Sequence, residues 1–227
     1  TVLADGSATP PDVNANLTDP DTFFTGGVAE FEITNPVVAL NGSGTADAPF
    51  IVVYLNTTGY KDITVAYNVR DLDGTTDNAI QQVALHYRVG ASGDYTNVPA
   101  AYIADATTGP STATLVTAVN VILPLAVENQ AQVELRIMTT NALGNDEWVG
   151  IDDISITGTL MAPEIALTKT VGTDPNSCAT TAEITLPAGG GEVTYCYEVE
   201  NTGNVTLNLH DLYDNQLGSM FDSLSYA

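Results

Sequence analysis

The sequence predicts an all-β protein, with a jelly-roll-like antiparallel β-sandwich followed by a partial immunoglobulin-like β-sandwich. Apolar and polar residues alternate along many short segments, and Gly, Asn, Asp and Thr separate these segments. No segment keeps a helical repeat over three turns. With 44% hydrophobic residues in 227, the chain has enough apolar side chains for buried cores.

The chain begins with a stretch that reads as an extended arm, residues 1–24. It contains the run TPP and Asp-Pro and Pro-Asp steps, with little periodicity. From Val28 onward we expect β-structure almost throughout, in a first domain that covers residues 25–158.

Six strands are expected in this first domain. In residues 61–70, KDITVAYNVR, strict alternation puts Ile63, Val65, Tyr67 and Val69 on one face. The other five segments are short and apolar or alternating: residues 50–55, 83–89, 114–123, 133–137 and 151–156.

The pattern breaks at TLMAP, residues 159–163, which we expect to be a linker ending in Pro163. The second domain then covers residues 164–227. Its expected strands are residues 165–170, 182–186, 193–200, 205–209 and 220–226. An immunoglobulin-like sandwich usually has about seven strands, so this domain is predicted to be incomplete and to have an open edge.

The second domain contains the run VTYCYEVENTGNVTLNLHDLYDNQLG, residues 193–218. This run resembles the conserved stalk repeats of bacterial and archaeal surface proteins. The resemblance implies an extracellular or cell-surface location.

The first domain carries three further runs: RDLDGTTDNAIQQVALHYRVG, YIADATTGPS and QAQVELRIMTTNALGNDEWVGIDDISITG. They resemble β-sandwich modules of large secreted bacterial proteins, some of which are attached to extracellular nucleases. The resemblance covers about residues 55–158 and implies an accessory module, without a nuclease active site.

The formal net charge is −23, from 5 basic and 28 acidic residues. Such a surface repels phosphate backbones and anionic lipids, which excludes nucleic acid and membrane surfaces as expected partners. No apolar run approaches the roughly 20 residues of a membrane helix. Together with Thr1 as first residue, this fits a processed, secreted chain. The charge itself serves either solubility or divalent-cation binding.

Cys178 and Cys196 are the two cysteines, and an even count in an extracellular chain predicts a disulfide between them. Asn-x-Ser/Thr sequons are either possible glycosylation sites or chance matches in a prokaryotic chain. They occur at Asn16, Asn41, Asn56 and Asn204.

The segment RDLDGTTDN places Asp71, Asp73 and Asp77 at the spacing of calcium loops, with Gly74 at the sharp turn. Calcium prefers six to eight hard oxygen ligands, of which the three aspartates together with Asn78 supply about half. The distal Glu of an EF-hand is missing. The alternative is a solvated turn between two strands.

A second acidic group precedes and enters the last strand of the first domain; it consists of Asn145, Asp146, Glu147, Asp152 and Asp153. Alternation turns either Asp152 or Asp153 inward, which is costly for a bare carboxylate. The run GIDDISI is similar to the final strand of jelly-roll carbohydrate-binding modules. That resemblance implies a structural Ca²⁺ here, and hydrogen bonds to backbone amides or to an arginine are the alternative.

Basic residues lie on the polar faces of separate strands, at Arg70, Arg88 and Arg136, and His86 shares this pattern. If these strands are neighbours in one sheet, the four side chains form a polar platform for a glycan or a carboxylate-bearing partner. Cross-strand Arg–Glu pairing is the alternative. No aromatic residue is expected on that face.

Catalysis is not expected, because His86 and His210 lie in different domains and neither is part of a nucleophile motif. We expect Trp148 to be a core anchor. The favoured hypothesis is a non-catalytic, extracellular structural or adhesive protein. It pairs with other copies or other surface components, head to tail, by donating a strand such as residues 1–17. The alternative is a carbohydrate-binding accessory module of a secreted enzyme. A nuclease fragment ranks last.

Overall fold

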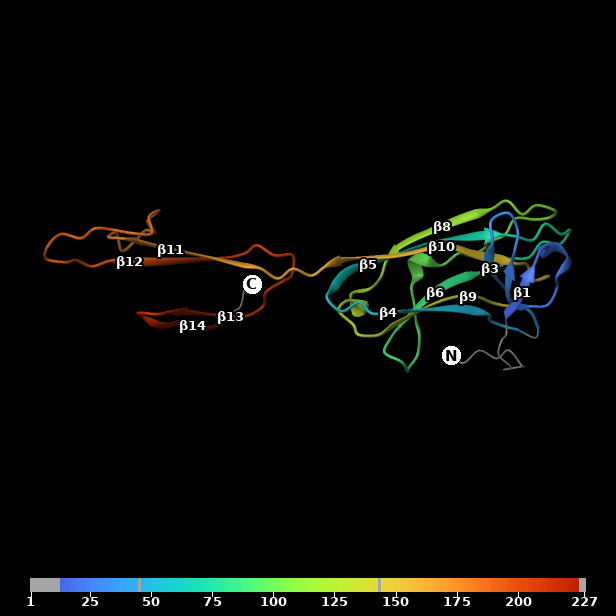
Figure 1. The fold of residues 1–227 in the computed structure, drawn as a ribbon, viewed down its shortest axis with the longest axis horizontal. Helices are drawn as coiled ribbons and strands as arrows, with labels where there is room; N and C mark the ends of the chain where they lie inside the picture. Colours follow the sequence, from blue (N-terminus) through green and yellow to red (C-terminus); the bar gives the residue numbers. More distant parts are fainter. Residues whose placement is uncertain (1–12, 45, 143, 225–227) are drawn as a thin grey trace. The chain divides into compact units, whose positions relative to one another are not determined.

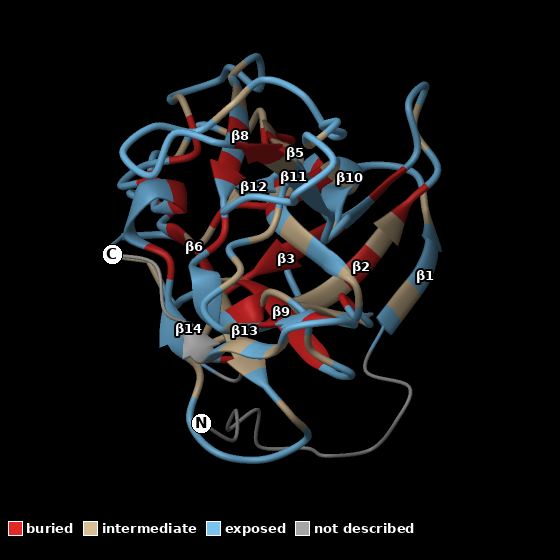
Figure 2. Cartoon of the chain, turned by 90° about the vertical axis from the view of Figure 1, so that its left-hand side faces the viewer, coloured by how far each residue is buried: buried red, intermediate tan, exposed pale blue. Residues whose placement is uncertain are grey.

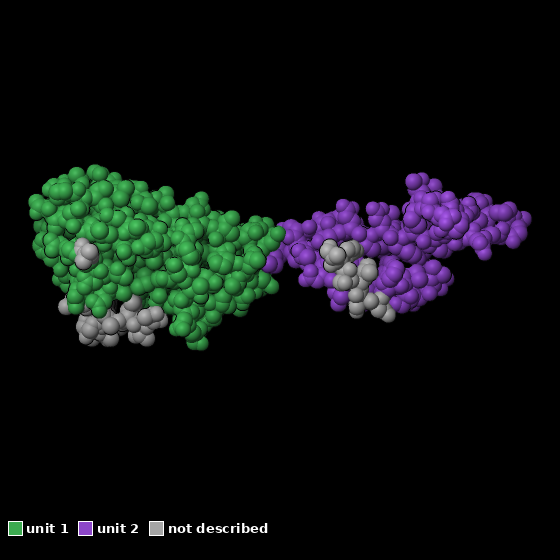
Figure 3. Space-filling view, turned by 180° about the vertical axis from the view of Figure 1, so that it is seen from behind, with its two compact units in different colours: residues 1–160 green, residues 161–227 purple. Residues whose placement is uncertain are grey.

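The computed structural model describes residues 13–44, 46–142 and 144–224, and it is almost entirely β (Figure 1). The predicted all-β class is therefore confirmed. The chain divides into two compact units, Thr1–Leu160 and Met161–Ala227 (Figure 3).

The first unit contains two sheets. The six-stranded sheet has the order β1 (Val13–Leu17), β2 (Gly27–Phe31), β3 (Val37–Asn41), β10 (Val149–Leu160), β5 (Tyr60–Asp71), β8 (Val116–Ile122). The four-stranded sheet has the order β4 (Phe50–Leu55), β9 (Val133–Thr139), β6 (Val83–Val89), β7 (Thr96–Asn97). The described part of this unit also contains three short 3-10 helices: η1 (Pro20–Thr22) between β1 and β2, η2 (Pro99–Ala101) between β7 and β8, and η3 (Leu125–Val127) between β8 and β9.

The two sheets share one hydrophobic core, to which β5 contributes Val65 and Tyr67 and β9 contributes Leu135 and Ile137. These side chains come from the alternate positions that the sequence pattern assigns to one face of each strand. Buried residues are coloured red in Figure 2. A β-sandwich follows from this shared core, as predicted.

A second, smaller core surrounds Trp148, which is fully buried. Its ring lies edge-on to Phe31, with centroids 5.2 Å apart, and stacks on Phe23 at 5.9 Å. The indole Nε1 donates to the backbone oxygen of Phe23 at 2.7 Å, which satisfies its one polar atom. The prediction of Trp148 as a core anchor is confirmed.

The predicted extended arm is wrong for residues 13–23. Strand β1 pairs in parallel with β2, with Val13 opposite Val28 and Leu17 opposite Phe31. Asp19 then caps η1 by accepting a hydrogen bond from Asp21 N. Asp-Pro steps in the sequence indicate local turns. They contain no information on the long-range pairing of β1 with β2. Residues 1–12 of the proposed donor strand lie outside the described residues.

Strand β10 contains an irregularity at its centre. Asp153 has φ 54°, and the register with β5 shifts between Asp152 and Ser155. Ile151 is buried before the shift, and Ile154 is exposed after it. The bulge changes which side chains of β10 point inward, so neither Asp152 nor Asp153 is a buried carboxylate without a partner.

The second unit has two separate two-stranded sheets. Strand β11 (Ile165–Gly172) pairs with β12 (Thr194–Asn201), and β13 (His210–Asp214) pairs with β14 (Gly218–Leu224), both antiparallel. Two expected strands, residues 182–186 and 205–209, are not assigned to any strand. Strand β13 was not expected, because its sequence HDLYD lacks a continuous apolar face.

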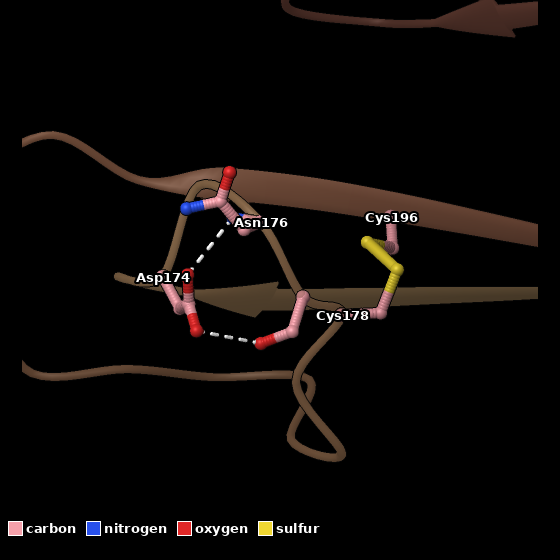
Figure 4. Close-up of a disulfide and its surroundings, with 5 residues drawn as sticks. Asp174, Asn176, Cys178 and Cys196 are labelled. Atoms are coloured by element: carbon pink, nitrogen blue, oxygen red, sulfur yellow. Dashed lines mark hydrogen bonds between the residues drawn. A yellow bond between two sulfur atoms is a disulfide. The ribbon is translucent and has the colours of Figure 1, made fainter.

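The disulfide between Cys178 and Cys196 is confirmed, with sulfur atoms 2.02 Å apart (Figure 4). The segment before it turns at Asp174, whose carboxylate accepts from Asn176 N and from Ser177 Oγ, each at 2.8 Å. The bridge attaches this irregular segment to β12. In the described residues, no helix has the length and apolar character needed to cross a membrane.

Candidate functional site

An acidic cleft of about 330 Å³ lies in the first unit. Loops from four places in the sequence line it: before β2, after β3, after β5 and before β10. The lining residues are Phe23, Phe24, Asn41, Ser43, Asp73, Asp77, Gly144, Asn145 and Asp146. The structure thus brings Asp146 together with Asp73 and Asp77, which the sequence placed in separate groups.

The loop after β5 is held by hydrogen bonds to its own carboxylates and to that of Asp21. Gly74 N donates to Asp21 Oδ1 at 2.6 Å, and Thr75 N donates to Asp73 Oδ1 at 3.0 Å. The hydroxyl of Thr75 donates to Asp77. Asp21 comes from η1, and its DPD sequence gave no sign that it meets this loop.

The environment moves the pKa values of these carboxyls in different directions. Burial raises the pKa of Asp73, and repulsion from Asp77 and Asp21 adds to the rise. Burial also raises the pKa of Asp146, which accepts from Ala142 N at 2.7 Å. The Thr75 hydroxyl lowers the pKa of Asp77.

Two further carboxyls, Asp71 and Glu147, are buried close to Asp73, with 4% and 1% of their surface exposed. Asp71 Oδ2 accepts from the backbone and hydroxyl of Thr108, both at 2.8 Å. Glu147 Oε1 accepts from Ala79 N at 3.2 Å. The second oxygen of each, Asp71 Oδ1 and Glu147 Oε2, is buried without a hydrogen-bond partner.

Asp71, Asp73 and Glu147 repel one another electrostatically. Burial raises the pKa of Glu147, and Asp71 and Asp73 raise it further. Burial likewise raises the pKa of Asp71, with a smaller contribution from Asp73. Asp73 therefore connects the cleft with the buried pair.

The observed ion pairs do not neutralise this group. Lys61, Arg70, Arg88 and Lys169 pair with carboxylates elsewhere. Their partners are Asp62, Asp152, Glu134 and Asp214. In the part of the chain that the structure describes, no group of three or more Asp, Glu, His or Cys side chains is placed to hold a metal ion.

Asp152 and Asp153 lie apart from the cleft residues, so the predicted acidic group is split. Arg70 Nη1 donates to Asp152 Oδ2 at 3.0 Å, and Asn35 Nδ2 donates to the same oxygen at 2.8 Å. Asp153 accepts from Asn68 Nδ2 at 2.9 Å. Of the alternatives expected for Asp152, the structure therefore shows hydrogen bonding to an arginine.

The predicted platform of three arginines is wrong for Arg70, which lies on β5 in the six-stranded sheet. The structure does bring His86, Arg88 and Arg136 together on the four-stranded sheet, where His86 lies opposite Arg136. Arg88 lies opposite Glu134, which is the predicted cross-strand pairing. Strand register, which the sequence does not give, separates Arg70 from the others.

Tyr95 lies between the two arginines of this sheet. The guanidinium carbons of Arg88 and Arg136 lie 4.5 and 4.0 Å from its ring centroid. Its hydroxyl donates to Glu134 Oε2 at 2.6 Å, and Arg88 donates to the same oxygen. Burial and the bond to Glu134 raise the pKa of Tyr95 to about 12. Glu134 thus pairs with Arg88 and also accepts the hydrogen bond from Tyr95.

The expectation that this face lacks aromatic side chains is wrong. Tyr95 covers the arginines, and Tyr54 lies opposite Glu134 with 70% of its surface exposed. Tyr95 follows β6 in a loop, outside the alternating pattern on which the expectation rested.

A polar clamp in the second unit joins its two sheets, formed by Lys169, Tyr197 and Asp214. Lys169 Nζ of β11 lies 2.5 Å from Asp214 Oδ2 of β13, and Tyr197 of β12 donates to the same oxygen at 2.7 Å. The ring of Tyr195 lies 4.3 Å from Lys169 Nζ. These donors hold the pKa of Asp214 well below its usual range. Sequence analysis did not identify this clamp.

The sequon asparagines differ in accessibility. Asn41 is buried at the cleft, whereas Asn16, Asn56 and Asn204 are exposed. Asn56 and Asn204 accept backbone hydrogen bonds through Oδ1, from Thr58 N and Ala162 N. Attachment of a glycan at Asn41 therefore requires a local opening.

Comparison with known proteins gives no match for this chain, whether with family models, curated proteins or solved structures.

Proposed function

We propose that this protein is a non-catalytic structural element of an extracellular assembly, in which β-strand pairing with a neighbouring copy completes the second unit. The observation that carries the proposal is that two segments with the sequence pattern of strands, residues 182–186 and 205–209, are not part of any strand. Both alternate apolar and polar residues as strands do.

The proposal is supported by how little apolar surface the second unit buries. Among its described residues, only Val171 and Leu212 are buried hydrophobic side chains. Leu167, Leu209 and Phe221 are each more than half exposed. Exposed apolar side chains next to free strand edges are typical of surfaces that accept a further strand.

Two-stranded sheets leave backbone donors and acceptors available along their outer edges. An added strand satisfies these groups and covers the alternate apolar side chains at the same time. Because the unit on each copy is the same, such pairing can repeat from copy to copy and give a filament.

The net charge of −23 opposes association between copies. Salt screens this repulsion, with a Debye length of about 10 Å at 0.1 M ionic strength. We therefore expect assembly to strengthen as salt rises, which distinguishes strand pairing from association through ion pairs.

An extracellular location is supported by the Cys178–Cys196 bridge, since disulfides persist in oxidising compartments and are rare in the cytosol. The sequence resemblance to surface stalk repeats agrees with this location.

The test is light scattering and electron microscopy of the full chain over a range of protein and salt concentrations. The proposal expects masses above that of one chain and thin filaments at raised salt. A monomer at every concentration, with slow hydrogen exchange along the outer edges of β12 and β14, contradicts it.

Glycan binding at the four-stranded sheet is a second candidate function. It is favoured by Tyr54, whose exposed ring lies next to the Glu134 network and offers a stacking surface. A glycan array tests it with Tyr54→Ala, and Tyr102→Ala removes an exposed tyrosine elsewhere in the unit as the control. Loss of array binding in the first variant alone supports this function, and no binding by the unmodified chain rejects it.

A further inference from the structure

We propose that the edge strand β8 of the first unit binds β8 of a second copy, antiparallel and across a twofold axis. The six-stranded sheets of the two copies then become one continuous sheet. This inference goes beyond the assembly proposed for the second unit and does not depend on it.

The first observation is the free backbone edge of β8. Strand β8 lies at one end of its sheet, with β5 as its neighbour among the described strands (Figure 1). Leu115 O accepts from Asp71 N, and Leu123 N donates to Ile63 O, so both residues that flank β8 bond toward β5. Because bonding directions alternate along an antiparallel strand, the even-numbered residues of Val116–Ile122 direct their backbone groups outward. No described strand pairs with them there.

The second observation is that the side chains of these residues are exposed and uncharged. Val116 and Ile122 have 56% and 69% of their surface exposed, and Ala118 and Asn120 are exposed between them. Residues 106–127 form the longest run of the sequence without Asp, Glu, Lys, Arg or His. Natural edge strands are usually protected from pairing by charges, proline or a bulge. Strand β8 has none of these.

The other sheet edges of the first unit are less open. Strand β1 shifts its register around Asn16, which has φ 59°, and β7 consists of two residues. In β4, Tyr54 is the one exposed side chain. Among the described edges, β8 is therefore the one best suited to accept a further strand.

Charge favours a second copy as the strand that pairs with β8. Each copy has a net charge of −23, so two copies repel each other wherever their acidic surfaces meet. At β8, the strand of neither copy brings a carboxylate to the contact. A cationic partner is instead attracted to the acidic surfaces and gains nothing from an uncharged edge.

Strand β8 is also complementary to itself. With the twofold axis at Val119, antiparallel pairing places Val116 of one copy opposite Ile122 of the other, and the reverse in the second half. Both exposed apolar side chains are then covered, and the outward backbone groups form the hydrogen-bonded pairs of the ladder. Pro124 has no N–H, so the ladder ends just after Ile122. Such a contact closes after two copies, whereas the pairing proposed for the second unit repeats.

The test uses the full chain carrying Leu167→Thr, which weakens the assembly proposed for the second unit. Light scattering and analytical ultracentrifugation measure its mass over a range of protein concentrations, at raised salt that screens the repulsion between copies. We expect the mass of one chain at low concentration and that of two chains at high concentration. A mass of one chain at every concentration overturns the proposal.

A matched pair of variants, made in the same chain, locates the contact. Ile122→Glu places a carboxylate opposite an apolar side chain of the partner in each half of the interface. It is expected to raise the Kd of the dimer at least about tenfold. Ile154→Glu makes the same change at an exposed isoleucine of β10 in the same sheet and is expected to leave the Kd unchanged. Equal Kd values in the two variants contradict the assignment to β8.

A second variant covers the case in which Ile122→Glu does not fold. Ala118→Pro deletes an outward N–H and none of the bonds to β5, a change that edge strands tolerate, and it is expected to abolish the dimer. Hydrogen exchange identifies the edge that pairs. The outward amides of Val116–Ile122 are expected to exchange more slowly in the dimer than in the monomer. Slowing on the edges of β1, β4 or β7 instead overturns the proposal.

Failure of this inference and failure of the proposed function give different results. Filaments of the unmodified chain that persist in Ile122→Glu, with no dimer in Leu167→Thr, contradict the pairing of β8 alone. A dimer that is lost in Ile122→Glu, without filaments of the unmodified chain, supports the pairing of β8 and contradicts assembly through the second unit.

Discussion

The two units of this protein contain strands of similar type and are stabilised differently. The first encloses two hydrophobic cores between and beside its sheets, including fully buried Tyr67, Phe31 and Trp148. The second buries only Val171 and Leu212 among its described apolar side chains, and it is held by a disulfide and a polar clamp. Strand content alone therefore does not indicate how stable a β-unit is by itself.

The largest effect is expected from Trp148→Ala in the first unit. Removing a fully buried indole that packs on Phe23 and Phe31 leaves a cavity and an unpaired carbonyl, lowering the free energy of unfolding by about 3–5 kcal/mol. Calorimetry measures the loss. Trp148→Phe is the control, since it keeps a ring and is expected to lose less.

Hydrogen exchange of the same variant tests the independence of the units. Amides of the second unit are expected to keep their protection in Trp148→Ala. Equal loss of protection in both units removes the distinction drawn between them.

The next effect is expected from the double variant Cys178→Ala, Cys196→Ala. The bridge closes a loop with a sequence separation of 18, and its removal is expected to cost the second unit about 3 kcal/mol. Limited proteolysis measures this as cleavage within residues 174–201. Unchanged protection would mean that packing, and not the bridge, holds this unit.

A smaller effect is expected from Asp214→Asn, which breaks the clamp to Lys169 and Tyr197 and makes the second unit easier to open. The pKa of Asp214 is depressed in the folded state, so its contribution is complete above the ordinary Asp value of about pH 4 and is lost as pH falls below it. Hydrogen exchange of β11 and β13 between pH 6 and pH 3 measures this. The acid sensitivity is expected to disappear in the variant.

The smallest effect on stability is expected from Leu167→Thr on β11. This side chain is 55% exposed, so the free energy of unfolding changes by no more than about 0.5 kcal/mol. Assembly in light scattering is nevertheless expected to fall, because Leu167 lies on the surface proposed to receive a strand. Leu125→Thr replaces an exposed leucine of the first unit and is expected to leave assembly unchanged.

Among the described residues, sequence alone locates six of the ten strands of the first unit and misses β1, β2, β3 and β7. In the second unit it locates β11, β12 and β14 and adds two strands that the structure does not contain. Residues 50–55 and 83–89 match β4 and β6 at both ends; the first is a continuous apolar run and the second alternates, and both patterns are typical of strands. Residues 182–186 show similar alternation and remain unpaired, since alternation reports the tendency to form a strand and not the presence of a partner.

The candidate cleft was predicted only in part. The spacing within residues 71–77 identified Asp71, Asp73 and Asp77 because they belong to one loop. The contribution of Asp21 depends on β1 and η1 folding back, and the separation of Asp152 from Asp146 depends on the arginine on β5. Both are long-range contacts, which local spacing does not contain.

The Cys178–Cys196 bridge also has a mechanical consequence. When the chain is pulled at its two ends, the residues between the cysteines are excluded from the extending length. Their sequence separation of 18 corresponds to roughly 60 Å of contour at about 3.4 Å per residue. The oxidised second unit therefore yields a shorter step than the reduced one when it ruptures under tension, and residues 179–195 between the cysteines bear no load.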